Sequence, residues 1–111
     1  MRVTSSLWVG AYVRRCHAEG AMAMVARHGA DEDGAIFVIV DRLNGAADLY
    51  APAPQTSFTE SKPSDRLFQR VAEGKALAAI DERLEREIRF DPDLWVVAVE
   101  DRDGRVFLEV G

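Results

Sequence analysis

The sequence predicts an α+β fold: a mixed, mostly antiparallel sheet of five or six strands with two main helices on one face. Residues 76–90 carry apolar side chains at helical spacing. Residues 36–40 and 94–99 are short apolar runs, as expected of buried strands. Asn44-Gly45 and Asp103-Gly104 each separate two strand-like segments, and such dipeptides favour two-residue hairpin turns because both turn positions need positive φ. A ferredoxin-like arrangement would fit this order of elements.

The first 30 residues are expected to form a strand and then a helix. In residues 6–13, Trp8 and Tyr12 would lie on one face of the strand and other apolar residues on the opposite face, which is typical of an inner strand. Residues 18–28 begin with an acidic and end with basic side chains, as the helix dipole favours, and Gly29 would end that helix. The helix would then connect two parallel strands in a right-handed crossover.

The middle of the chain is expected to form a hairpin followed by a loop. Asn44-Gly45 would turn the chain between strands at residues 35–42 and 47–50. Residues 51–64, with three prolines and several serines and threonines, would form a long loop. Residues 66–72 fit either a short helix or an edge strand, and the pattern slightly favours the strand.

The C-terminal third gives the clearest elements. The helix at residues 76–90 ends at Asp91-Pro92, because a proline disfavours helical geometry in the residue before it. Its apolar stripe consists of Leu77, Ile80, Leu84 and Ile88. A strand at residues 94–99 follows, and Asp103-Gly104 would turn the chain into a last strand at residues 105–110.

Composition and charge limit the classes of function. The 111 residues are enough for one core, and we expect residues 1–111 to form a single domain. The net charge of −5 argues against nucleic acid as the partner, and a single cysteine excludes an internal disulfide. Arg14 and Arg15 close the first apolar run too early for a secretory signal, and no stretch reaches the roughly 20 apolar residues of a membrane span. We therefore expect a cytoplasmic protein with no membrane contact.

Two groups of residues are candidates for a binding or catalytic site. Arg14, Arg15 and Cys16 could supply an activated thiolate or an anion site. Asp91 and Asp93 could form an acid–base pair or hold a cation, although aspartate is also favoured at helix ends and turns, which is the interpretation that we prefer. His17 and His28 would lie about 16 Å apart on the predicted helix, too far to share a metal ion. We expect neither a metal nor a cofactor.

The predicted sheet also suggests a partner. Its inner strands are apolar on both faces, whereas two helices on one side can cover only one face. The other face, with Trp8, Tyr12 or Trp95, would need a cover. A second subunit is one candidate for that cover, and the loop at residues 52–58 is another.

Several short strings of the sequence form a familiar set. The most specific is Phe-Asp-Pro-Asp-Leu-Trp at residues 90–95, and the others are at residues 5–9, 11–15, 34–38, 49–52 and 100–101. Over nearly its whole length the chain resembles a bacterial family catalogued as domain of unknown function 1491. The resemblance implies a small, usually single-domain protein with no assigned activity, cofactor or catalytic residue.

The favoured hypothesis is a small cytoplasmic module that binds itself, as a homodimer, or another protein. The alternative is a small enzyme or an anion-binding protein that uses Arg14, Arg15 and Cys16 with Asp91 or Asp93 nearby. Of these two hypotheses, the enzyme is the less favoured.

Overall fold

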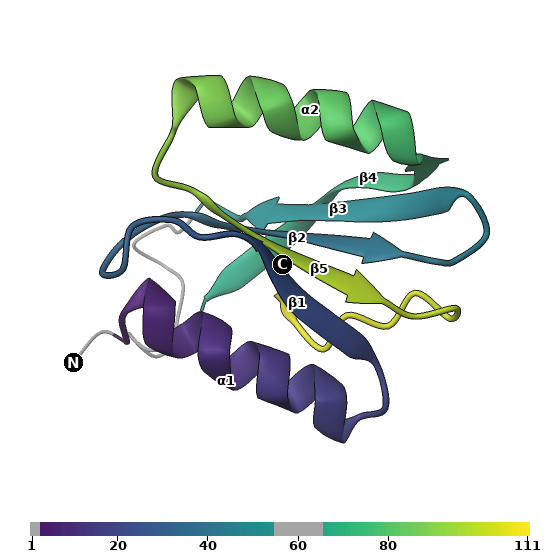
Figure 1. Ribbon diagram of the computed structural model, residues 1–111, viewed down its shortest axis with the longest axis horizontal. Helices are drawn as coiled ribbons and strands as arrows, with labels where there is room; N and C mark the ends of the chain where they lie inside the picture. Colours follow the sequence, from purple (N-terminus) through teal and green to yellow (C-terminus); the bar gives the residue numbers. More distant parts are fainter. Residues whose placement is uncertain (1–2, 55–65) are drawn as a thin grey trace.

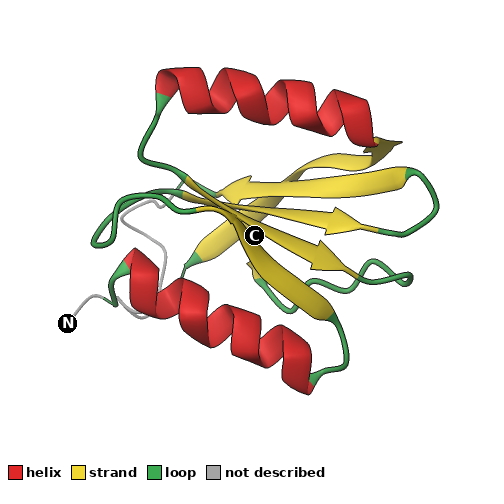
Figure 2. Cartoon of the chain, viewed as in Figure 1, coloured by secondary structure: helices red, strands yellow, loops and turns green. Residues whose placement is uncertain are grey.

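The computed structural model describes residues 3–54 and 66–111, and it places a sheet between two helices (Figures 1 and 2). In chain order, the described elements are α1 (Ser5–Ala18), β1 (Met22–Arg27), β2 (Ile36–Asp41), β3 (Ala46–Pro52), β4 (Leu67–Ala76), α2 (Leu77–Phe90), β5 (Trp95–Glu100) and β6 (Glu109–Val110). The predicted α+β class and the mixed sheet are confirmed.

The six strands lie in the order β1-β5-β2-β3-β4-β6. The pairs β1–β5, β2–β3 and β3–β4 are antiparallel, and the pairs β2–β5 and β4–β6 are parallel. The central parallel pair aligns Ile36 with Trp95 at one end and Asp41 with Glu100 at the other. Successive side chains of a strand point to opposite faces, so each central strand contributes to two separate cores.

The prediction that both helices lie on one face is wrong. In Figure 1, α1 lies below the sheet and α2 above it. The buried residues of α1 join one core with Val38 and Val97, and those of α2 join a second core with Phe37 and Val96. Because neighbouring residues of the same strands serve the two cores, the helices cover opposite faces. This arrangement also rules out the ferredoxin-like alternative, in which both helices would share one face.

The strand predicted at residues 6–13 is wrong, since these residues belong to α1. The Thr4 hydroxyl accepts a hydrogen bond from the Leu7 amide at 3.2 Å, which is typical of a helix N-cap. Burial then recurs every three or four residues, at Val9, Tyr12 and Cys16, while Leu7 is 67% exposed. The apolar residues of this segment fit a period of two as well, but their burial follows the period of a helix.

The helix predicted at residues 18–28 is also wrong. Gly20 has a positive φ of 89° where the chain leaves α1, and β1 then pairs with β5 as an edge strand. Ala23 is buried between the exposed Met22 and Met24, as the alternation of a strand requires. Pairing with the open edge of β5 thus outweighs local helix propensity, and the predicted crossover between parallel strands is absent. Gly29 ends no helix, and the backbone of residues 93–94 leaves no room for a side chain there.

The middle of the chain confirms several predictions. The hairpin between β2 and β3 is present, but its connection has three residues, Leu43 to Gly45, rather than the predicted two: the Arg42 amide donates to the Ala46 carbonyl at 3.0 Å, and positive φ occurs at Leu43 (61°) and Gly45 (90°). The Asn44 side chain accepts a hydrogen bond from the Ala46 amide at 3.0 Å. The preference for a strand at residues 66–72 is correct, and β4 continues to Ala76. The predicted loop at residues 51–64 begins too early, because β3 runs to Pro52; residues 55–64 of it lie outside the described residues.

The two predicted elements around Pro92 are confirmed, whereas the last hairpin is wrong. Helix α2 buries Ile80 and Leu84, and β5 follows it. Gly104 does adopt a turn conformation, with φ of 72°, but the chain beyond it does not return along β5. Both edges of β5 are already occupied by β1 and β2, so β6 pairs in parallel with β4 at the far end of the sheet.

Candidate functional site

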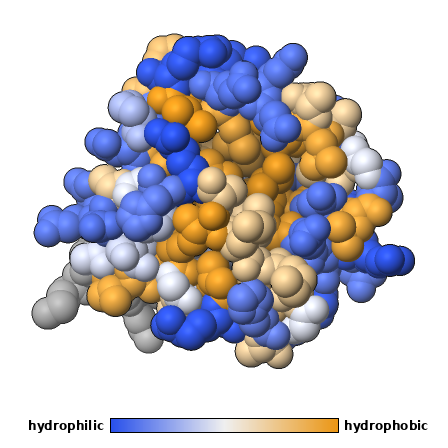
Figure 3. All heavy atoms as spheres, viewed as in Figure 1, coloured by the Kyte–Doolittle hydropathy of each residue, from blue (hydrophilic) through white to orange (hydrophobic). Residues whose placement is uncertain are grey.

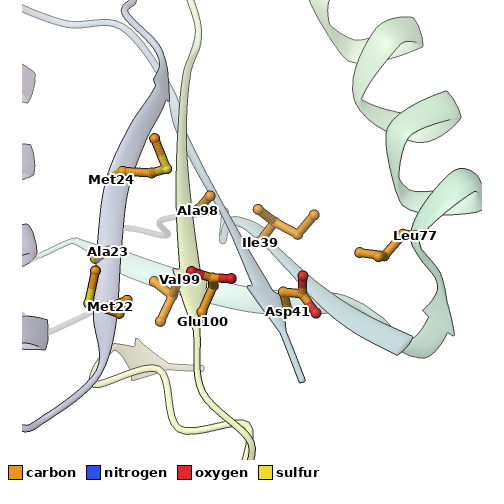
Figure 4. Close-up of a pocket in the computed structure, with 9 residues that line it drawn as sticks. All are labelled: Met22, Ala23, Met24, Ile39, Asp41, Leu77, Ala98, Val99 and Glu100. Atoms are coloured by element: carbon orange, nitrogen blue, oxygen red, sulfur yellow. The ribbon is translucent and has the colours of Figure 1, made fainter. Parts of the chain in front are cut away.

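Helix α2 covers only part of its face of the sheet. It packs on β3 and β4 and reaches the beginnings of β2 and β5, but on this face it leaves β1 and the remaining parts of β2 and β5 without a covering helix (Figure 1). A hollow of about 260 Å³ lies over these strands. Five of the apolar residues that line it form what we call the methionine shelf: Met22, Met24, Ile39, Leu77 and Ala98 (Figure 4).

The methionine shelf exposes large apolar side chains to solvent. Met22 and Met24 are each 64% exposed, although both belong to a regular strand of the sheet. Figure 3 shows hydrophobic residues gathered in the middle of the molecule in this view, with hydrophilic residues around them. A contiguous apolar area with a polar rim is typical of a protein-binding surface.

Two carboxylates line one end of the methionine shelf, and an arginine lies beyond its other end. Asp41 and Glu100 are neighbours across the β2–β5 pair and line one end of the hollow. Neither carboxylate has a cationic partner within the described residues. Arg27 is aligned with Val96 at the other end, and its guanidinium donates to the Pro92 carbonyl at 2.8 Å. The charged residues are therefore distributed asymmetrically along the strand direction.

The free edge of β1 is partly capped. A ring nitrogen of His17, at the end of α1, lies 3.0 Å from the Ala23 carbonyl oxygen. This contact occupies one of the backbone groups that an added strand would need. The open surface at β1 is thus the face that carries the methionines rather than the strand edge.

The structure separates the members of the predicted arginine–cysteine site. Arg14 and Arg15 are exposed, whereas Cys16 is fully buried among apolar residues. Burial raises the pKa of the Cys16 thiol, and Tyr12 and Arg15 offset that effect only in part. Because a nucleophilic cysteine needs a lowered pKa and access to substrate, Cys16 lacks both properties.

Asp91 and Asp93 form a backbone turn apart from Arg14 and Arg15. The Asp91 carboxylate accepts a hydrogen bond from the Asp93 amide at 3.1 Å, and the Asp93 carbonyl accepts one from the Ala30 amide at 2.9 Å. The loop at residues 29–34 joins this turn to the beginning of α1, where the Ser5 hydroxyl donates to the Gly34 carbonyl at 2.6 Å. Arg15 lies ten residues further along α1, a distance of about 15 Å along the helix axis.

The three aromatic residues predicted at an interface lie largely inside the chain. Trp95 is 2% exposed, its indole nitrogen donates to the Ala30 carbonyl at 2.8 Å, and the His28 ring packs on it with 4.1 Å between centroids. Tyr12 is 5% exposed, and the half-buried Trp8 stacks on it with 5.0 Å between centroids. Sequence reasoning missed Met22 and Met24, although the Met-Ala-Met alternation at residues 22–24 could have indicated a strand with an exposed apolar face.

A second hollow lies between α1 and the segment that follows β5. It has a volume of about 200 Å³ and is lined by Trp8, Ala11, Tyr12, Arg15 and Phe107. The Tyr12 hydroxyl donates to the Val106 carbonyl at 2.6 Å and so ties α1 to this segment. Burial, and then the nearby Cys16, raise the pKa of Tyr12 above its ordinary value, so its hydroxyl stays protonated at neutral pH.

Two buried carboxylates have structural partners. Asp48 is fully buried and accepts hydrogen bonds from the Arg42 guanidinium, at 3.0 and 2.7 Å, and from the Gly74 amide at 2.7 Å. Asp101 is bound by the side chain and the backbone amide of Arg105.

Within the described residues, no group of three histidine, cysteine, aspartate or glutamate side chains is placed to bind a metal ion. No described helix has both the length and the apolar character to cross a membrane.

Comparison with known proteins gives the family. A family model described as "Protein of unknown function (DUF1491)" matches residues 3–109. The chain belongs to the DUF1491 family. This confirms the resemblance inferred from the sequence strings, and the description of DUF1491 assigns no activity. A comparison with curated proteins gives no match.

Solved structures of DUF1491 proteins share the fold. The crystal structure of a DUF1491 family protein from Caulobacter crescentus is 38% identical with a TM-score of 0.80, and the match covers 100% of this chain and 99% of that one. An NMR structure of a DUF1491 family protein from Caulobacter crescentus has the same identity and TM-score, with coverage of 100% and 98%. The solution structure of protein Atu0922 from A. tumefaciens is 43% identical with a TM-score of 0.78, over 90% of this chain and 86% of that one.

Proposed function

We propose that this DUF1491 protein is a small cytoplasmic interaction module that forms a homodimer through the methionine shelf. The observation that carries the proposal is the 64% exposure of both Met22 and Met24 on a sheet face that α2 leaves half covered. Burying a large apolar side chain is favourable by roughly 1.5–3 kcal/mol, so a partner that covers this shelf gains from contacts that the chain itself leaves unmade.

The charges at the ends of the methionine shelf favour a second copy as the partner. Arg27 lies at one end and Asp41 and Glu100 at the other. A two-fold axis that runs between the two shelves, parallel to the sheets and perpendicular to the strands, reverses the strand direction between the two copies. Arg27 of each copy then lies near the carboxylates of the other, and the two shelves face each other. An axis parallel to the strands would bring like charges together.

The size of the methionine shelf sets the expected affinity. Association costs about 4–15 kcal/mol in lost translational and rotational freedom. Two methionines from each copy, with the smaller residues around them, offset this cost only moderately. We therefore expect a weak dimer, with a dissociation constant in the micromolar to millimolar range, which forms and separates readily with concentration.

The experiment is light scattering over protein concentrations from the micromolar to the millimolar range. The wild-type mass should rise from that of a 12.3 kDa monomer towards twice that value. Met24→Glu should keep the chain monomeric at every concentration, because it places a charge in the apolar contact. Leu7→Glu is the matched control, since Leu7 is 67% exposed but lies on α1. It should dimerise as the wild type does.

Two results would end the proposal. One is a wild-type mass that stays at the monomer value at millimolar concentration. The other is a dimer that both variants leave intact, because the contact would then lie away from the methionine shelf.

A charge reversal gives an independent check of the orientation. Glu100→Arg should weaken the dimer, and adding Arg27→Glu in the same chain should restore it.

A further inference from the structure

The hollow between α1 and Phe107 lies on the face of the sheet opposite the methionine shelf, and the proposed dimer does not use it. One side of the hollow is a single stripe of α1. Its members Trp8, Ala11, Tyr12 and Arg15 follow the spacing i, i+3, i+4 and i+7 and so share one side of the helix. Phe107 lies across from them. Because Ala11 contributes only a methyl group, the middle of the stripe is open.

The residues around this hollow suit a flat, negatively charged molecule. Trp8 and Tyr12 are stacked with 15° between their ring planes, and Phe107 adds a third aromatic surface. Arg15 is exposed and has no ion pair within the described residues, whereas the nearby Arg105 is bound to Asp101. A guanidinium group binds a carboxylate through two parallel hydrogen bonds. A free positive charge beside aromatic rings stands out in a chain whose net charge is −5.

The backbone at Phe107 gives independent support. Its φ is 55°, in the left-handed region that residues other than glycine rarely adopt. Strained residues of this kind are concentrated at binding and catalytic sites. Two contacts hold the segment in place: the Tyr12 hydroxyl bonds the Val106 carbonyl, and the Arg105 guanidinium lies 5.3 Å from the centre of the Phe107 ring. The aromatic wall is thus positioned before a ligand arrives, which lowers the entropic cost of binding.

We propose that this hollow binds a small planar aromatic carboxylate, with the ring between Phe107 and α1 and the carboxylate on Arg15. Its volume of about 200 Å³ is below the roughly 300–1,000 Å³ of sites for drug-sized ligands, so it accommodates a single ring. The site binds its ligand without transforming it, because the Tyr12 hydroxyl is already engaged with Val106 and the Cys16 thiol is buried.

The test is an NMR titration of the full-length protein with three probes. Benzoate has the ring and the charge, benzamide has the ring without the charge, and cyclohexanecarboxylate has the charge without the planar ring. Benzoate should cause saturable shifts at the backbone amides of Ala11, Arg15 and Phe107 and at the Trp8 indole. The other two probes should bind at least several-fold more weakly. Equal affinity for all three probes, or benzoate shifts located elsewhere, would overturn the proposal.

Three variants make the test specific. Arg15→Gln should weaken benzoate binding roughly tenfold, through the loss of a charge-assisted contact. Arg14→Gln is the matched control, because it removes the same charge from an adjacent exposed residue that does not line the hollow, and it should change the affinity by less than about twofold. Ala11→Leu should abolish the saturable shifts by filling the hollow, while leucine remains a good helix former. Equal losses in both arginine variants, or wild-type binding by Ala11→Leu, would contradict the proposal.

Discussion

On the α1 face of the sheet, the covering segments are attached by polar contacts as well as by packing, whereas on the α2 face the contact is apolar and incomplete. Tyr12 bonds the Val106 carbonyl, and Asp101 and Arg105 brace the segment that carries it. Helix α2 packs through Leu77, Ile80, Leu84 and Ile88, and no hydrogen bond within the described residues joins its side chains to a strand. The α1 face is closed, and hydrogen bonds fix the positions of its covering segments. The α2 face is left partly open.

The difference between the faces separates two roles. Polar contacts with fixed geometry specify one arrangement, because a buried donor or acceptor left without its partner is costly. They suit a face that must hold a shaped hollow beside α1. Apolar packing has no direction, so the methionine shelf can be covered by a separate chain without the loss of any internal contact. The proposed dimer therefore uses the apolar, partly open α2 face, and the proposed ligand site uses the α1 face, whose shape is fixed by hydrogen bonds.

The largest effect on stability is expected at Asp48, whose side chain points to the α1 side of the sheet. Asp48→Ala removes the acceptor of the Arg42 guanidinium and of the Gly74 amide, and it should lower the free energy of unfolding by about 2–4 kcal/mol. Met24→Ala, which removes a longer but exposed side chain from the methionine shelf, should cost less than about 1 kcal/mol. Urea unfolding at low micromolar protein concentration measures both values.

The comparison of the two faces fails if Met24→Ala costs as much as Asp48→Ala under these conditions. Asp48→Asn serves as an additional control, because the amide keeps one acceptor oxygen and nearly the same volume. Its cost should fall between those of the other two variants.

A smaller effect is expected at Tyr12. Tyr12→Phe keeps the ring but leaves the Val106 carbonyl without its partner, so the free energy of unfolding should fall by about 1–2 kcal/mol. Tyr50→Phe is the matched control, since Tyr50 is 4% exposed and its hydroxyl makes no hydrogen bond within the described part of the chain. Thermal unfolding of the two variants gives the difference. Amide exchange should also become faster at residues 105–108 in Tyr12→Phe alone. Equal stability losses and equal exchange rates in the two variants would contradict the role of the Tyr12–Val106 hydrogen bond in holding this segment on α1.

The sequence predicted the elements that depend on local chemistry. Asn44-Gly45 and Asp91-Pro92 limit what the backbone can do, and the hairpin between β2 and β3 and the end of α2 were placed correctly. The apolar stripe of α2 is repeated over three turns and has no competing interpretation. The family could be inferred from strings spread over the whole chain.

The errors come from segments in which two periods fit the same residues. Residues 6–13 contain enough apolar side chains to satisfy a strand, and only tertiary contacts show that Leu7 is exposed while Val9 and Tyr12 are buried. Residues 22–27 are an edge strand because β5 offers an open edge, which the local sequence does not encode. Because of these two errors, neither candidate site could be predicted: the methionine shelf depends on β1 being a strand, and the hollow between α1 and Phe107 depends on α1 being a helix.

The smallest effect is expected at Asp101, and it depends on pH. Hydrogen bonds from Arg105 hold the pKa of the Asp101 carboxyl below its ordinary value of about 3.9. A carboxyl whose pKa is lower in the folded chain stabilises the fold above its unfolded pKa, and this contribution disappears as the pH falls through the folded pKa. The stability difference between wild type and Asp101→Asn should therefore be constant near neutral pH and should shrink below about pH 4. Asp103→Asn removes a nearby carboxylate that Arg105 does not bond, so this variant should keep the pH dependence that the Asp101 carboxyl produces. If the Asp101→Asn difference persists to pH 2, the ion pair contributes nothing to closing the α1 face, and packing and the Tyr12 bond must account for it.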